Sequence, residues 1–193
     1  MDILAKLLGN QARVKIMRLF LSNKSKAFTP LDVAKRSRVA IDSVRREIRL
    51  LSSVGFVKKR NDDWYFDMNF RYANEFESLL IKSDTFEHNV ILDMFKKVGK
   101  LKFMVISGFF IKDKESRVDL LLVGDKLNKS KIEDNIKKME AEIGKELVYA
   151  VFETKDFIYR LNMYDKLVRD ILDFPHEIIL QAKELSTQIL KKL

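Results

Sequence analysis

The apolar positions of the first 54 residues recur at helical spacing, with a break at Gly9-Asn10. Residues three and four apart share one face of a helix, so this pattern predicts a short helix before the break. A second, denser helix is predicted from the apolar residues between Val14 and Leu21. A third is predicted to begin after Thr29, a good N-cap, with Pro30 in the first helical position.

The segment "IDSVRREIRLLSSVGF" predicts a fourth helix, from Ile41 to Val54, with Gly55 at its end. On a helix its apolar residues gather on one side and its arginines project from roughly the opposite side. The apolar set is Val44, Ile48 and Leu51, and the basic set is Arg45, Arg46 and Arg49. Residues 56–69 then predict two short strands around the polar turn Asn61–Asp63.

Two amphipathic helices are predicted in the middle of the chain. Phe76, Leu79 and Leu80 mark the first, and the apolar residues between Phe86 and Phe95 mark the second. Their apolar faces must be covered by another part of the chain or by a second copy. We expect a homodimer, in which a second copy helps to cover these faces.

The last half of the chain alternates strand and helix patterns. Buried strands are predicted in "LKFMVISGFF", "RVDLLLVGD" and "ELVYAVF", and "FPHEIIL" predicts a short edge strand. Ser130, with Glu133 three residues later, predicts the capped start of a helix that Gly144 ends. Further helices are predicted from Lys155 onward and over residues 181–193. This alternation indicates a small α/β layer with a mixed sheet.

Charge is segregated along the chain. The formal net charge is +9, and residues 1–72 hold 16 Lys/Arg against 7 Asp/Glu, whereas the remainder is balanced. The whole excess therefore belongs to the first third, which indicates an anionic partner for that part. The alternative is a solvated charged face that serves solubility.

Other residue types exclude several classes of site. The chain has no cysteine, which excludes disulfides and thiolate metal sites, and His88 and His176 are not at ligand spacing. No apolar run reaches the length of about 18 residues that a membrane-spanning helix needs. We expect a cytoplasmic protein without a membrane partner.

The order helix, helix, turn, basic helix, basic hairpin over residues 8–68 resembles the winged helix-turn-helix regulators of the arsenic-repressor type. The resemblance implies that residues 41–54 enter the major groove of double-stranded DNA while the hairpin straddles a phosphate backbone. The implied DNA-binding residues are Ser43, Arg45, Arg46, Arg49, Lys58, Lys59 and Arg60. A winged helix can also dock proteins, which stays open as the alternative.

The order of elements after residue 99 resembles the minimal nucleotidyltransferases of the polymerase-beta-like superfamily. The motif of that family is Gly-Ser, a short loop and Ser-Asp-x-Asp. The corresponding residues are Gly108, Phe109, Ser116, Arg117 and Asp119. Phenylalanine replaces the phosphate-binding serine, and Arg117 replaces one of the two acids that hold metal ions. An expected third acid is not evident between Leu147 and Phe152.

These observations predict an α+β protein with three parts. They are a winged helix-turn-helix domain (1–68), a helical linker or dimerisation segment (69–98), and a nucleotidyltransferase-like domain that lacks catalysis (99–193). The predicted function is a DNA-binding transcription regulator whose second domain binds an effector or dimerises, without a cofactor. Gly108, Ser116, Arg117 and Asp119 form a remnant that could bind a nucleotide. The alternatives are an active, magnesium-dependent nucleotidyltransferase and an antitoxin-like protein with a protein partner.

Overall fold

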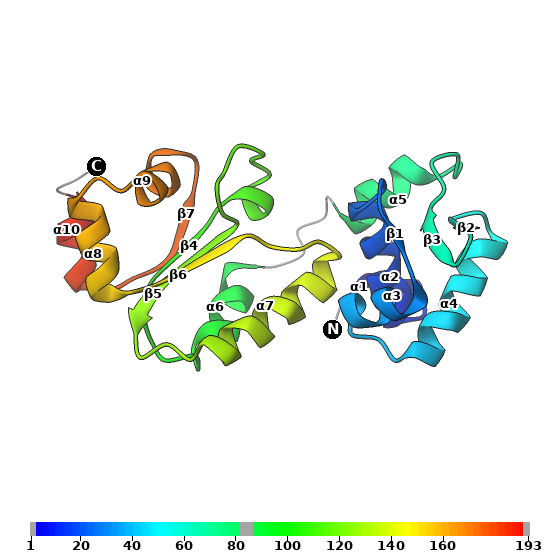
Figure 1. The fold of residues 1–193 in the computed structure, drawn as a ribbon, viewed down its shortest axis with the longest axis horizontal. Helices are drawn as coiled ribbons and strands as arrows, with labels where there is room; N and C mark the ends of the chain where they lie inside the picture. The colour runs from blue at the N-terminus through cyan, green and yellow to red at the C-terminus, as the bar shows by residue number, and fades with distance from the viewer. Residues whose placement is uncertain (1–2, 82–86, 191–193) are drawn as a thin grey trace. The chain divides into compact units, whose positions relative to one another are not determined.

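The computed structural model of the protein describes residues 3–81 and 87–190, and it has an α+β fold with two separate sheets (Figure 1). The chain divides into two compact units. The first contains residues 1–85 and 136–146, and the second contains residues 86–135 and 147–193. No helix of the described residues is long and apolar enough to cross a membrane.

Local capping signals mark the starts of two helices of the first unit, α2 and α3. Asn10 caps one of them by accepting a hydrogen bond from the Ala12 amide at 2.9 Å. Thr29 forms a capping box with Asp32, and Pro30 occupies the first helical position as the sequence predicts. The helices are α1 (Ile3–Leu7), α2 (Gln11–Ser22), α3 (Pro30–Ser37), α4 (Ile41–Ser53) and α5 (Ala73–Leu80).

A small antiparallel sheet completes the first unit. Its strands are β1 (Ala27–Phe28), β2 (Val57–Arg60) and β3 (Asp63–Phe66), in the spatial order β1-β3-β2. The register places Arg60 opposite Asp63, so β3 begins one residue earlier than predicted and the turn narrows to Asn61-Asp62. Gly55 adopts the left-handed conformation just after α4, with φ of 78°, which suits a residue without a Cβ.

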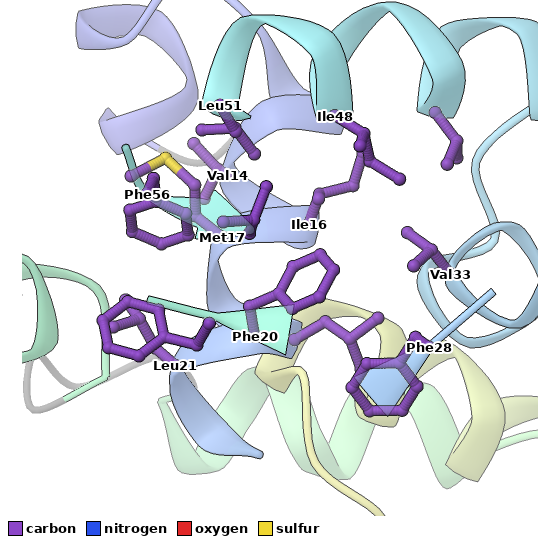
Figure 2. Packing of buried hydrophobic residues seen from close by; sticks show 14 of the residues in the cluster. Val14, Ile16, Met17, Phe20, Leu21, Phe28, Val33, Ile48, Leu51 and Phe56 are labelled. Carbon is purple, nitrogen blue, oxygen red and sulfur yellow. The ribbon is translucent and has the colours of Figure 1, made fainter. Parts of the chain in front are cut away.

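The core of the first unit is formed mainly by α2. Figure 2 shows its side chains packed against those of α3, α4 and the sheet. Phe56 makes edge-to-face contacts with Phe66 and Phe70, both at a ring separation of 5.2 Å. Such pairs add to the free energy of apolar burial. The side of α4 that is buried in this core is therefore the side that carries the apolar residues predicted from the helical spacing.

The end of α7 (Lys129–Ile143) also belongs to the first unit and packs against α2. Asn23 Nδ2 donates to the Gly144 carbonyl at 2.7 Å, and the buried Arg18 donates to the Glu142 carbonyl at 3.3 Å. Gly144 has a φ of 80°, and a Cβ built on it would lie 2.4 Å from the Arg18 carbonyl carbon. A glycine is therefore required for this close approach.

The second unit is built on a four-stranded mixed sheet of order β6-β5-β4-β7. Strand β5 pairs parallel with β6 and antiparallel with β4, and β7 pairs antiparallel with β4 at the edge, where a strand was expected. The strands are β4 (Lys100–Ile106), β5 (Leu120–Asp125), β6 (Tyr149–Glu153) and β7 (Glu177–Gln181). A short 3-10 helix, η1 (Gly108–Ile111), follows β4.

Helices cover this sheet, and Phe103 on β4 packs against Phe157 of α8 at 5.6 Å. The helices are α6 (His88–Phe95), α8 (Thr154–Asn162), α9 (Lys166–Asp173) and α10 (Lys183–Leu190). Phe86, which was expected to begin the helix before β4, lies outside the described residues. The predicted capping box at Ser130 is wrong, because α7 begins at Lys129 and Asn128 Oδ1 accepts from the Lys131 amide at 3.0 Å.

Candidate nucleic-acid interface

The inner face of α4 is apolar and its outer face is basic. Val44, Ile48 and Leu51 are buried in the core, whereas the side chains of Arg45, Arg46 and Arg49 are exposed. At 3.6 residues per turn these two sets lie on opposite sides of the helix. The structure thus brings three of the predicted site residues onto one exposed face.

Glu47 holds α4 from its buried side, a role that was not predicted from the sequence. Its carboxylate accepts hydrogen bonds from Asn10 Nδ2 at 2.6 Å and from Arg13 Nε at 2.8 Å. A buried carboxylate needs such partners, since burying an unpaired charge is costly. The helical spacing could have predicted this role. Glu47 follows Val44 by three positions and precedes Leu51 by four, which places it on the apolar side of the helix.

The exposed arginines of α4 differ in their partners. Arg45 lies 3.4 Å from Asp42 Oδ1, one turn earlier on the helix. Arg46 donates to Ser43 Oγ at 3.2 Å, so this serine is in contact with the basic face as well. Arg49 makes no ion pair with any residue that the structure describes. Among the described residues, therefore, neither Arg46 nor Arg49 has an acid that compensates its charge.

The hairpin of β2 and β3 carries the remaining predicted contacts. Lys58 Nζ lies 2.7 Å from Asp67 Oδ2, and the buried Asp67 also accepts from the Asn69 amide at 3.0 Å. The hydrogen bond to Lys58 lowers the pKa of Asp67 and raises the pKa of Lys58. Lys58 is consequently committed to a structural ion pair, although half of its side chain stays exposed.

The other two cations of the hairpin, Lys59 and Arg60, are held less firmly by acids than Lys58 is. Lys59 is 3.8 Å from Asp62 in the turn, at the limit of an ion pair, and such exposed pairs contribute little. Arg60, at the end of β2, has no ion-pair partner among the residues described in the structure. Within the part of the chain that the structure describes, Arg60 thus joins Arg46 and Arg49 as a guanidinium group without an acid partner.

In the second unit, the carboxylate of Asp119 accepts hydrogen bonds from main-chain amides. Its Oδ1 accepts from the Phe109 amide at 2.7 Å, and its Oδ2 accepts from the Val148 amide at 2.8 Å. Gly108 makes room for it, since a Cβ at that position would lie 2.3 Å from Oδ1. The carboxylate therefore ties the turn after β4 to the residue before β6.

The other residues of the expected nucleotide-binding remnant point to other partners. Arg117 Nε lies 2.9 Å from Asp170 Oδ2 of α9, whereas the oxygens of Asp119 accept from main-chain amides, so these two residues of the motif have different partners. Ser116 donates to Asp113 Oδ2 at 2.6 Å within the loop. Across residues 3–81 and 87–190, no group of three or more histidine, aspartate or glutamate side chains is placed to hold a metal ion.

Comparisons of the chain with protein-family models, with curated proteins and with solved structures gave no match.

Proposed function

We propose that this chain is a transcription regulator that binds double-stranded DNA through a winged helix-turn-helix over residues 1–68. The element order α2-β1-α3-α4-β2-β3 and the sheet order β1-β3-β2 support this assignment. In such a domain α4 enters the major groove and the β2–β3 hairpin contacts the phosphate backbone.

The observation that carries the proposal is the exposed arginine face of α4, opposite its buried apolar face. Guanidinium groups pair with phosphates and with the O6/N7 edge of guanine, so one helix can supply both affinity and sequence selection. The concentration of the whole net charge in residues 1–72 adds a long-range attraction to a polyanion.

We propose a non-catalytic role, effector binding or dimerisation, for the nucleotidyltransferase-like remainder of the chain. Both oxygens of Asp119 are engaged by main-chain donors, and Arg117 stands where the family motif has an acid. These features support retention of the fold for a purpose other than phosphoryl transfer.

Light scattering of the purified chain would measure whether it is the homodimer that we expect.

Fluorescence anisotropy with a labelled random-sequence duplex, over a series of salt concentrations, tests the DNA-binding proposal. Arg45→Ala with Arg49→Ala should weaken binding at least about 10-fold and reduce the salt slope by about one unit for each phosphate that the protein no longer neutralises. A matched control replaces Lys129 and Lys131, two exposed lysines of α7, and removes the same charge elsewhere. Equal effects of the two double variants would contradict the assignment of α4 as the DNA-binding helix.

The hairpin supplies a second, graded comparison. Arg60→Ala should weaken binding more than Lys58→Ala, because Lys58 is already paired with Asp67 whereas Arg60 is not. The melting temperature of each variant separates loss of binding from loss of folding. A larger binding defect in a Lys58→Ala protein that melts like the wild type would argue against this division of roles.

A further inference from the structure

The exposed face of α4 contains one acid among its arginines. Asp42 lies in the first turn, 85% of its side chain is exposed, and its Oδ1 is 3.4 Å from Arg45. The other acid of α4, Glu47, is buried and bonded to Asn10 and Arg13, so it cannot meet a ligand. Asp42 is thus the single carboxylate that α4 presents beside its basic side chains.

Helical geometry puts Asp42 in the middle of that face. Arg46 and Arg49 follow it by four and seven positions, which places all three side chains within about 60° of one another on a 3.6-residue helix. A carboxylate there opposes binding to any phosphate backbone, since like charges repel. A surface that needed only affinity for a polyanion would be weakened by it.

Base edges offer this carboxylate a partner that phosphates do not. In the major groove the N4 amino group of cytosine is a donor, and aspartate can accept from it. Guanine and the thymine carbonyl present acceptors instead. Adenine has an amino donor at N6, but its N7 acceptor lies beside that donor and would repel the carboxylate. One acid within a basic face therefore favours cytosine and disfavours non-matching sequences.

We propose that Asp42 is a specificity-determining residue, which accepts a hydrogen bond from a cytosine amino group and suppresses binding to other DNA. The inference rests on the proposed function and names the base that the helix selects. Asp42 also orients Arg45 through their contact, so the two residues act on neighbouring positions of one site.

The test begins with selection of bound sequences from a random duplex library by the full-length wild type, Asp42→Asn and Asp62→Asn. Asp62 is the control, because it is fully exposed beside Lys59 in the hairpin turn and its change removes the same charge. The wild type and Asp62→Asn should share a cytosine that Asp42→Asn loses, with about a 10-fold smaller discrimination at that position. Affinity for non-specific DNA should rise in both variants.

A second arm leaves the protein unaltered. In this arm a pyrimidine analogue without the N4 amino group replaces the selected cytosine. It should weaken binding of the wild type by about 10-fold and leave the affinity of Asp42→Asn unchanged. Unaltered base preference in Asp42→Asn, or an equal loss with the analogue in both proteins, would overturn the inference. Absence of DNA binding by the wild type at low salt would instead refute the proposed function itself. An Asp42 that only stabilised the helix start would change the melting temperature and no base preference.

Discussion

The contact between Gly144 and α2 can be tested by adding one methyl group. Gly144→Ala places a Cβ 2.4 Å from the Arg18 carbonyl carbon and 2.5 Å from the Leu19 nitrogen. Both atoms belong to the main chain of α2, so no side-chain rotation can relieve the clash. Gly55→Ala is the matched control, since Gly55 has nearly the same φ, 78° against 80°, and no atom within 4 Å of the added Cβ.

The two substitutions share one cost and differ in another. A left-handed conformation costs an alanine about 1–2 kcal/mol, and the entropy of the unfolded chain falls equally in both variants. Forcing extra volume into a packed site adds roughly 1–3 kcal/mol. We therefore expect Gly144→Ala to destabilise the first unit by about 1–3 kcal/mol more than Gly55→Ala does.

Urea unfolding followed by tryptophan fluorescence measures this difference. The chain has one tryptophan, Trp64, which lies on β3 and packs against the core of the first unit. Hydrogen exchange over residues 136–146 detects the other way of relieving the clash, which is local release of that segment from α2. Coincident unfolding midpoints and equal exchange in the two variants would show that Gly144 does not approach α2 this closely.

Three further predictions concern the cores and the loop ties. Phe56→Ala should reduce the free energy of unfolding of the first unit by about 3–5 kcal/mol, since the ring is fully buried among other aromatic rings, and a Trp64-detected loss under 1 kcal/mol would contradict this packing. Asp119→Asn should speed hydrogen exchange at the Phe109 or the Val148 amide, because an amide side chain has one acceptor oxygen for two main-chain donors; unchanged exchange at both amides would refute the double hydrogen bond. The pKa of Asp67 is lowered by its hydrogen bond to Lys58, so the pair stabilises the fold above the unfolded pKa of about 3.9 and this contribution is lost as pH falls through the lower folded pKa. The stability difference between wild type and Asp67→Asn should therefore shrink below about pH 4, and a difference that stays constant down to pH 2 would be inconsistent with the pair.

Features with local causes were predictable from the sequence. The start of α3 depends on Thr29 and Pro30, which are adjacent, and the orientation of α4 depends on the spacing of its own apolar residues. The alternation of strands and helices in the last half likewise needed no long-range information. These elements were confirmed because neighbouring residues alone determine them.

Features that depend on distant partners were not predictable. Asn128 and Ser130 are both good N-caps by residue type. The structure uses Asn128, whose amide also donates at 2.7 Å to the carbonyl of Val98, a residue between α6 and β4. The partners of Asp119 lie 10 and 29 positions away, so a motif comparison could find the residue without its role. The contact of Gly144 with α2 bridges more than a hundred residues.

The anchoring of Glu47 has a consequence for the thermodynamics of binding. Because Asn10, Arg13 and the apolar core hold α4 before any ligand arrives, little conformational entropy is left to lose when a ligand binds its outer face. The heat-capacity change of binding should then reflect only the surface removed from water, without the additional contribution of coupled folding. Residues on the outer face can also be exchanged with little effect on the helix itself, which makes α4 a rigid support for altered recognition.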